Sequence, residues 1–518
     1  MAPVTTRNRW TLVATILASS LTFIDATVVN VALPALQADL QATITDVQWV
    51  IEAYALFLGA LMLVGGSLGD QFGRKRVFLS GVGLFTGASI ACGLAISPAM
   101  LIAGRAVQGV GAAFLVPGSL AIISATFDEA ERGRAIGVWS GFSAITTAIG
   151  PVAGGWLIEH VSWRAVFFLN VPLAVIVLVL SLRFMEETRD PSRTSQIDWP
   201  GAALAVLGLG GTVVGLLEWP ELGARHPLVA AASTIGLLSL VLLVAVERRA
   251  PSPMLPLALF RSRPFTLANL LTLLLYAALS VVLFLVPLNL IQVQHYSATA
   301  AGAALLPLPL IVFALSRWSG GLVARVGARL PLTAGPMVAA IGLALYARPG
   351  VGGAYWTTFF PAMVVLGVGM AVTVAPLTTT VMGTVDRRHA GVASGINNTV
   401  SRVAGLLAIA IFGILLGRAF DARTRPPLDA LGLSSTARAE VDRELRKIGG
   451  ADMTQLSSIP TSERGVIRAI VDDGFVFAFR VVMIGAASLA LVAAAFGSAI
   501  RHHDVEASFT GEAASRDA

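Results

Sequence analysis

Three charged side chains stand inside apolar stretches near the start of the chain, where they could carry or control a proton. Asp25 occurs in FIDATVVNVALP, Glu52 in WVIEAY and Arg105 in LIAGRAVQG. At about 1.5 Å per helical residue, Asp25 would lie about 13 Å from Pro34, and Arg105 about 8 Å from Met100. A carboxyl group at such a depth can gain or lose a proton when its solvation or its distance from a cation changes. We therefore expect these three side chains to lie at similar depth and to couple proton transfer to a conformational change.

Each of these residues also has a simpler explanation that the sequence leaves open. Asp25 could be hydrogen-bonded within a helical bundle, and Glu52 lies only about 7 Å into its apolar stretch. Arg105 could extend its guanidinium to the end of its helix. If the guanidinium neither reaches the end of the helix nor meets an acidic partner, placing an arginine in hydrocarbon costs roughly 2.5–3.5 kcal/mol.

The composition indicates that membrane-spanning helices must position these residues. Of 518 residues, 56% are hydrophobic, 51 are glycine and 13% are charged, a charged share about half that of a soluble protein. A helix needs roughly 20 apolar residues to cross a bilayer, so the chain is long enough for many spans. The composition predicts an all-α integral membrane protein and excludes a soluble enzyme.

Apolar windows predict fourteen transmembrane helices in a 6+2+6 arrangement, with two inserted helices between two six-helix bundles. The windows cover residues 11–34, 47–68, 77–97, 100–124, 135–158, 164–184, 200–218, 227–246, 265–291, 300–323, 330–347, 355–384, 390–417 and 475–500. The predicted domains are a cytoplasmic N-tail (1–10), an N-terminal bundle (11–184), a charged linker with the inserted helices and a basic linker (185–264), a C-terminal bundle (265–500) containing an outer loop (418–474), and a cytoplasmic C-tail (501–518).

Lysine and arginine in the short loops predict the orientation. With the N-terminus inside, most loop cations fall on the cytoplasmic side: Arg74, Lys75, Arg76, Arg132, Arg134, Arg183, Arg189, Arg193, Arg248, Arg249, Arg261, Arg263, Arg325, Arg329, Arg387 and Arg388. Arg164, Arg225 and Arg348 remain on the opposite side. The run 11–34 is too long for the core of a signal peptide. We expect a multi-pass protein of the cell membrane, of the bacterial inner-membrane kind, with both termini in the cytoplasm.

Two similar segments form an internal repeat. Gly66 to Lys75 reads GSLGDQFGRK, and Gly320 to Arg329 reads GGLVARVGAR, each at the end of the second span of its half. The first copy resembles the signature between the second and third helices of the major facilitator superfamily. The resemblance implies the major facilitator fold, two bundles that work by alternating access, with a cytoplasmic latch formed by Gly66, Gly69, Asp70, Gly73 and Arg74.

Two further motifs resemble those of the same superfamily. Leu101, Arg105, Gln108, Gly109 and Gly111 are similar to its second motif, and the stretch from Gly150 to Gly155, GPVAGG, is similar to its antiporter motif. Pro151 removes a backbone hydrogen bond and glycines allow close helix packing. We expect an antiporter hinge formed by Gly150, Pro151, Gly154 and Gly155, although Thr146 stands where the family pattern has another glycine.

Other stretches resemble the fourteen-helix branch of drug:proton antiporters within this superfamily. They are FIDATVVNVALPAL with Gln48-Trp49, Trp163-Arg164 followed by Phe167, Asn170 and Pro172, Asp198 to Gly201, and Ala390 to Gly395 with Asn397, Asn398 and Arg402. The resemblance implies that Asp25 is the main proton carrier, Glu52 an auxiliary carrier and Arg105 the switch.

Aromatic and polar residues could line a substrate cavity. The candidates are Phe23, Phe57, Trp139, Phe142, Tyr276, Phe284, Phe313, Trp318, Asn398 and Arg402. Arg402 and Arg480 would attract an anion, whereas Asp25 and Glu52 would favour a cation, and the sequence leaves this choice open. Each aromatic residue could equally face lipid or pack between helices.

The sequence contains no nucleotide-binding loop, metal cluster or nucleophile motif, and Cys92 is its single cysteine. We expect no enzymatic activity, cofactor, metal or nucleic-acid partner, but a monomer in contact with membrane lipids, protons and a small-molecule substrate. The predicted function is proton-coupled efflux of amphipathic organic compounds or drugs. The alternatives are a dedicated exporter of one self-made metabolite or antibiotic, a proton symporter, and a receptor without transport activity.

Overall fold

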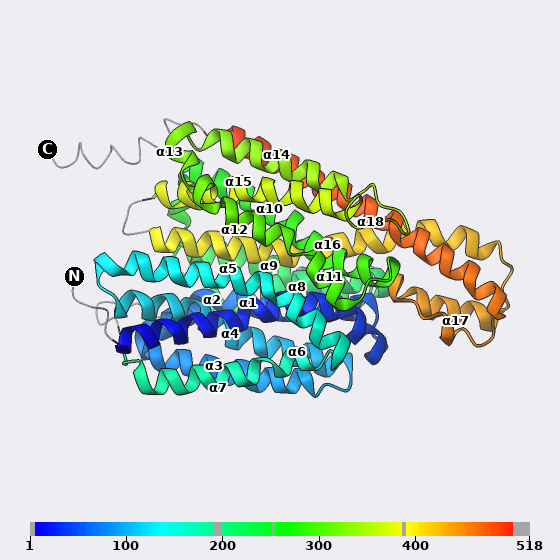
Figure 1. The fold of residues 1–518 in the computed structure, drawn as a ribbon, viewed down its shortest axis with the longest axis horizontal. Helices are drawn as coiled ribbons and strands as arrows, with labels where there is room; N and C mark the ends of the chain where they lie inside the picture. Colours follow the sequence, from blue (N-terminus) through cyan, green and yellow to red (C-terminus); the bar gives the residue numbers. More distant parts are fainter. Residues whose placement is uncertain (1–5, 190–197, 251–252, 254, 386–389, 501–518) are drawn as a thin grey trace. The chain divides into compact units, whose positions relative to one another are not determined.

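The computed structural model describes residues 6–189, 198–250, 253, 255–385 and 390–500, and these residues form helices and the turns between them (Figure 1). The chain divides into two compact units. Unit 1 comprises Met1–Met254 and Ser297–Ala303, and unit 2 comprises Leu255–Tyr296 and Ala304–Ala518. The predicted C-tail, most of the N-tail, Arg193, Arg387 and Arg388 lie outside the described residues.

The first segment of unit 1, up to Met254, contains nine helices among its described residues: α1 (Thr6–Leu40), α2 (Ile44–Phe72), α3 (Arg74–Gly93), α4 (Pro98–Thr126), α5 (Glu129–His160), α6 (Ala165–Phe168), α7 (Asn170–Phe184), α8 (Trp199–Leu222) and α9 (Pro227–Glu247). Local sequence fixes several of their ends. Thr43 and Asp46 form a capping box at the start of α2, and Ser97 caps α4 ahead of Pro98. These side chains satisfy backbone N–H groups that have no partner within the helix.

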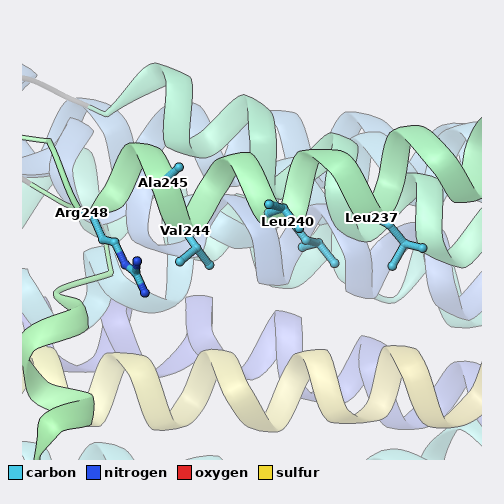
Figure 2. Close-up of a pocket in the computed structure, with 6 residues that line it drawn as sticks. Leu237, Leu240, Val244, Ala245 and Arg248 are labelled. Carbon is cyan, nitrogen blue, oxygen red and sulfur yellow. The ribbon is translucent and has the colours of Figure 1, made fainter.

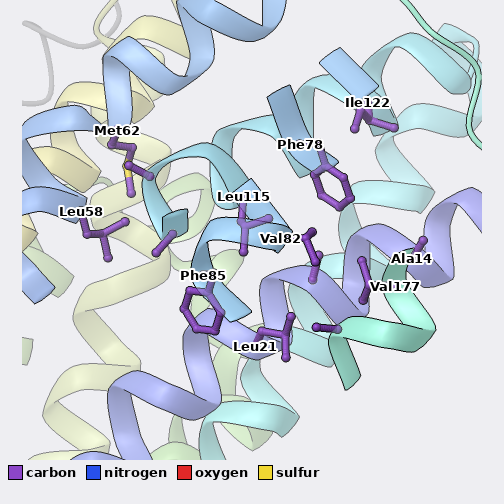
Figure 3. Packing of buried hydrophobic residues seen from close by; sticks show 14 of the residues in the cluster. Ala14, Leu21, Leu58, Met62, Phe78, Val82, Phe85, Leu115, Ile122 and Val177 are labelled. Atoms are coloured by element: carbon purple, nitrogen blue, oxygen red, sulfur yellow. The ribbon is translucent and has the colours of Figure 1, made fainter. Parts of the chain in front are cut away.

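Aromatic and aliphatic side chains from five helices form the core of unit 1 (Figure 3). Its members include Ala14, Leu21, Leu58, Met62, Phe78, Val82, Phe85, Leu115, Ile122 and Val177, all buried. Because lipid is as apolar as these side chains, close packing rather than water exclusion must hold the helices together. Glycines make that packing possible where α3 crosses α4. A Cβ on Gly111 would lie 2.6 Å from the backbone nitrogen of Phe85.

Gly111→Ala should lower the thermal stability of the purified protein, because the new methyl group must push α3 away from α4. Overpacking of this kind costs about 1–3 kcal/mol. The matched control is Gly83→Ala on α3, where an added Cβ would meet nothing within 4 Å. Unfolding midpoints of the two variants in the same detergent provide the measurement. Equal midpoints would show that the α3–α4 crossing does not depend on this glycine.

The two inserted helices form a tight pair within unit 1. Gly211 of α8 meets Ala232 and Gly236 of α9, and Gly215 meets Ser233. The α8–α9 pair is joined to α2, where the Trp49 indole N–H donates to Glu218 Oε1 at 2.9 Å. The inserted segment therefore packs as a helical hairpin on the second span.

Unit 2 is likewise helical over its described residues. Its elements are η1 (Leu257–Arg261), α10 (Arg263–Leu288), the π-helical turn η2 (Asn289–Val293), α12 (Pro307–Gly320), α13 (Leu322–Val326), α14 (Arg329–Leu345), α15 (Phe359–Gly383), α16 (Ala390–Asp429), α17 (Ser435–Leu445), η3 (Ile448–Gly450), η4 (Met453–Gln455) and α18 (Thr461–Ser498). The short helix α11 (Ala298–Ala304) belongs to unit 1 in all but its last residue.

The predicted all-α membrane fold is confirmed. Twelve helical segments of the described chain are long and apolar enough to cross a membrane, and α5 and the 17-residue α14 occupy the other two predicted windows. Some windows differ in detail. Residues 300–323 are divided among α11, α12 and α13 rather than forming one helix. Pro307 explains one break, because proline favours the first turn of a new helix.

Residues 418–474, which we call the cap, are more ordered than the predicted polar loop. Helices α16 and α18 continue into the cap from both sides, and α17 lies between them in the chain. Within the cap, hydrogen bonds from Ser458 and Ser457 hold the pKa of the Glu440 carboxyl below its usual value. Polar composition concealed these helices, because hydropathy alone does not distinguish a solvated helix from a loop.

Candidate functional site

Asp25 and Arg105 form an ion pair in the interior of unit 1. Asp25 lies on α1 and Arg105 on α4, and each side chain is almost completely buried. Arg105 Nη1 donates to Asp25 Oδ2 at 2.5 Å. This contact excludes the alternative in which Arg105 extends to the end of its helix. Depth along the helices had left both Asp25 and Glu52 as possible partners of Arg105, and in the structure the partner is Asp25.

Two amides complete the hydrogen bonding of the Asp25 carboxylate. Gln108 Nε2 donates to Asp25 Oδ1 at 2.8 Å, and Asn170 Nδ2 donates to the same oxygen at 3.3 Å. Asn170, on α7, is itself held by Ser89 Oγ at 2.9 Å. The carboxylate is carried by α1, its hydrogen-bond donors come from α4 and α7, and α3 contributes Ser89, which holds Asn170. Both oxygens of the Asp25 carboxylate therefore accept hydrogen bonds.

The guanidinium of Arg105 is equally well satisfied. Its Nε donates to the Val50 carbonyl oxygen at 3.0 Å, and its Nη1 also donates to Gln108 Oε1 at 2.7 Å. The Tyr54 ring lies 4.2 Å from the guanidinium carbon, a cation–π geometry. In this conformation Asp25 and Arg105 are in direct contact, a state that we call the closed pair, and each charge compensates the other.

Glu52, the predicted auxiliary carrier, makes no hydrogen bond to this network. It is fully buried on α2, and neither carboxyl oxygen has a hydrogen-bond partner among the described residues. An isolated carboxylate cannot be held in such surroundings without a very large desolvation penalty. The neutral, protonated acid is the form that this site accommodates.

The predicted latch has the expected contact. Asp70 Oδ1, in the last turn of α2, accepts hydrogen bonds from Arg74 Nε at 2.9 Å and Nη2 at 2.8 Å. Gly73 between the helices has φ +110°, a conformation that disfavours any residue with a side chain. Gly66 and Gly69 lie on the same end of α2, and a Cβ on Gly69 would touch Arg74.

The sequence did not reveal that this turn is also tied to the end of α7. Glu187 accepts hydrogen bonds from the backbone N–H groups of Lys75 and Arg76, at 3.0 and 3.2 Å. In return, Lys75 Nζ donates to the Met185 carbonyl oxygen at 2.7 Å. A carboxylate at a helix N-terminus and an ammonium at a helix C-terminus both match the helix dipoles.

The predicted hinge glycines lie where α5 approaches other segments of unit 1. A Cβ on Gly150 would collide with Thr27 of α1, and one on Gly154 would lie 2.8 Å from Val28. Gly155 meets the backbone of Ala298 at the start of α11. Pro151 stands within the continuous helix α5, beside these contacts. Close approach explains why small residues are required here.

The predicted substrate-cavity residues do not share one environment. In unit 1, Phe23 packs edge-on against Trp139, whose indole donates to Ser19 Oγ, while Phe57 is partly buried and Phe142 is exposed. In unit 2, Phe284 is buried in the core, whereas Phe313, Trp318 and Asn398 are exposed. Tyr276 and Arg402 are partly buried and lie within electrostatic reach of each other.

An open apolar groove runs along α9, and it is not a convincing substrate site (Figure 2). Its lining residues come from one helix: Leu237, Leu240, Val241, Val244, Ala245 and Arg248. Binding pockets usually bring a few polar groups together from several elements, but here Arg248 at one end is the single polar side chain. The groove has the character of a lipid-facing surface. Among the described residues, no group of His, Cys, Asp and Glu could hold a metal ion.

Two helical units with long apolar spans and buried, compensated charges define a polytopic membrane protein of the transporter class. The sequence pattern of the Major Facilitator Superfamily matches residues 15–409. The chain belongs to this superfamily, whose members are transporters of small molecules rather than enzymes.

Known relatives cover most of the chain. It is 34% identical over 425 residues to the multidrug resistance protein Stp of Mycobacterium tuberculosis, covering 81% of this chain and 78% of that one. It is 32% identical to the tetracenomycin C resistance and export protein of Streptomyces glaucescens, covering 94% and 90%. A bacterial homologue of the human lysosomal transporter Spinster, solved in an inward-facing conformation, is similar in fold, with a TM-score of 0.68, 17% identity and 98% coverage of both chains.

Proposed function

We propose that this protein exports amphipathic organic compounds, including drugs, in exchange for protons. Its relatives are named for multidrug resistance, antibiotic resistance and antibiotic export. The observation that carries the proton-coupling proposal is the buried Asp25–Arg105 pair, together with the unpartnered Glu52. A proton-driven transporter needs an acid whose solvation or pairing changes during the cycle.

Asp25 is the main proton carrier in this proposal, and Arg105 is its switch. While the pair is closed, Asp25 is an anion and binds no proton. When a conformational change moves α4 relative to α1, the carboxylate loses its cation and takes a proton from the accessible side. Closing the pair expels that proton on the other side. Gln108 and Asn170 keep the carboxylate oriented in both steps.

Glu52 acts as an auxiliary carrier. Its surroundings accommodate the neutral acid in the present conformation, so it holds a proton while Asp25 does not. Water entry from one side would allow that proton to leave. The two acids would then occupy opposite protonation states, which is a means of linking proton movement to one direction of conformational change.

The proton gradient supplies the energy. One proton that crosses the membrane yields about 2.3 kcal/mol per 100 mV of potential and about 1.4 kcal/mol per pH unit. In the orientation with both termini inside, the Asp70–Arg74 latch and its ties to the end of α7 lie on the cytoplasmic side. The Gly150–Gly155 motif provides the packing surface along which α5 moves.

A dedicated exporter of one compound is the second candidate. The names of two relatives each specify a single antibiotic or antibiotic class for export, tetracenomycin C and cephamycin. The machinery would be the same, and the difference would lie in selectivity. Uphill transport of one member of a chemically diverse panel would favour this candidate, and transport of many unrelated members would favour multidrug efflux.

Proteoliposomes test the proposal directly. With an acidic compartment on the side from which protons should enter, the purified protein should move part of a diverse dye and drug panel against its gradient, with proton movement in the opposite direction. Collapse of both pH and voltage gradients with ionophores should stop uphill movement. Uphill movement that persists after collapse would overturn proton coupling, and proton movement in the same direction as substrate would indicate a symporter.

A further inference from the structure

Arg402 is a positive charge in the middle of a membrane span. It lies about 18 Å along α16 from the first residue of that helix, and about 22 Å from the end of the predicted window at residue 417. Neither distance allows its side chain to reach the membrane surface by snorkelling. An arginine at such a position costs roughly 2.5–3.5 kcal/mol on insertion scales, so it requires a compensating role.

No described acidic residue of unit 2 forms an ion pair with this charge. Between Leu255 and Gly417 the sequence contains one acidic residue, Asp386, which lies outside the described residues. Among the residues that the structure describes, Arg402 has neither an ion pair nor a hydrogen bond. Arg105, by contrast, has Asp25, and Arg480 donates to the Pro349 carbonyl oxygen at 3.0 Å.

Polar side chains lie at the contact between α10 and α16, the helix that carries Arg402. Asn397 donates to Thr272 Oγ1 at 2.6 Å and to Asn269 Oδ1 at 3.2 Å. Farther along the helices, a Cβ on Gly405 would lie 2.8 Å from Ser280 Oγ. Residues 269, 272, 276 and 280 follow helical spacing, so Tyr276 continues the same face of α10. Tyr276 therefore lies on the face of α10 that packs on α16, the helix that carries Arg402.

Two side chains of unit 2 could donate hydrogen bonds to a ligand bound at Arg402. Tyr276 lies within electrostatic reach of Arg402 and can donate a phenolic hydrogen. Asn398 precedes Arg402 by one helical turn and therefore shares its face of α16. Asn398 is exposed, and its amide can donate as well. Arg402 and these two neighbours therefore offer a ligand one positive charge and several hydrogen-bond donors in one region of unit 2.

We infer that Arg402, with Tyr276 and Asn398, binds the acidic group of an organic anion, such as a carboxylate or a phenolate. The inference rests on the proposed export function and specifies its substrate class. Arginine binds carboxylates through two parallel, charge-assisted hydrogen bonds, which are among the strongest polar contacts in proteins. Unit 1 supports the same choice, because Asp25 is already compensated by Arg105 and Glu52 fits as a neutral acid. Neither offers a free negative charge to an organic cation.

The test compares acids with their esters. The purified full-length protein in lipid nanodiscs is titrated with naphthoic acid, anthracene-9-carboxylic acid and rhodamine B, each beside its alkyl ester. The wild-type protein should bind the acids more tightly than the esters. Arg402→Gln should weaken acid binding by about 10- to 100-fold and leave ester binding within about twofold, while Arg402→Lys should retain an intermediate preference. Arg423→Gln, which breaks an exposed ion pair with Asp473 in the cap, is the control and should keep the wild-type acid preference.

Three results would overturn the inference: no acid preference in the wild type, an unchanged preference in Arg402→Gln, or an equal loss of acid and ester binding. Because binding is measured without a gradient, the result is independent of transport. Acid binding that depends on Arg402, combined with no proton-driven flux in proteoliposomes, would overturn the proposed function and leave the anion site intact.

Discussion

Asp25→Asn should reduce uphill efflux to the level of empty proteoliposomes while substrate binding remains measurable. Asparagine has nearly the same size as aspartate and still offers an oxygen to Gln108 or Arg105, but it cannot take up and release a proton. The variant should therefore move substrate down its own gradient and fail to use the pH gradient. Uphill flux at a fixed pH difference, downhill flux without one, and equilibrium binding are the three measurements.

Asp39→Asn is the control on the same helix. Asp39 Oδ2 accepts from Arg164 Nη1 at 2.6 Å and from the Trp163 indole at 3.0 Å, near the end of α1, and its side chain is 47% exposed. The same change from carboxylate to amide at that position should leave uphill efflux near the wild-type rate. Normal proton-driven efflux by Asp25→Asn would remove Asp25 from the proton pathway and leave Glu52 as the remaining candidate.

The meeting of Asp25 and Arg105 could be predicted only in part, because depth offered Arg105 two acids, Asp25 and Glu52. Two charged residues at similar depth in neighbouring spans, with no other stable partner, have a strong reason to pair. Glu52 shows the limit of the same count. Depth does not specify the direction in which a side chain leaves its helix, and neither carboxyl oxygen of Glu52 has a hydrogen-bond partner among the described residues.

The supporting residues could not be predicted for a different reason. Gln108 and Asn170 were recognised as parts of motifs, but their shared contact with Asp25 requires that α7 pack beside α1 and α4. Nothing in a single sequence states which helices are neighbours. The same holds for Glu187, whose charge looked like part of an ordinary loop. The Asp70–Arg74 contact, by contrast, follows from four-residue spacing and could be predicted directly.

The apolar windows predicted the membrane-spanning helices but did not predict the helices of the cap. Hydrocarbon imposes a helix on any chain segment that crosses it, because backbone hydrogen bonds must be satisfied internally. Hydropathy therefore predicts α1 or α10 from composition alone. In the cap, water can satisfy the backbone in either conformation, so polar composition does not indicate that α16 continues to Asp429.

Arg105→Gln should be the most destabilising single substitution at the site. It removes the cation and leaves the Asp25 carboxylate buried with amide donors only. Loss of one partner of a buried ion pair costs about 3–5 kcal/mol. The double variant Asp25→Asn/Arg105→Gln should regain much of this stability, because neither charge is then present. Thermal unfolding midpoints of the two single variants, the double variant and the wild type form a double-mutant cycle.

Arg164→Gln is the reference variant for this cycle, because it shows how much the loss of an exposed ion pair lowers the unfolding midpoint. It breaks the ion pair with Asp39, in which both side chains are partly exposed, and pairs of that kind contribute about 0–1 kcal/mol. If Arg105→Gln lowered the midpoint no more than Arg164→Gln, Asp25 would have to be neutral in the wild-type protein. The closed pair would then not be the proton-free state, and the order of protonation proposed for Asp25 and Glu52 would have to be reversed. Recovery in the double variant would instead identify the buried charge itself as the source of the instability.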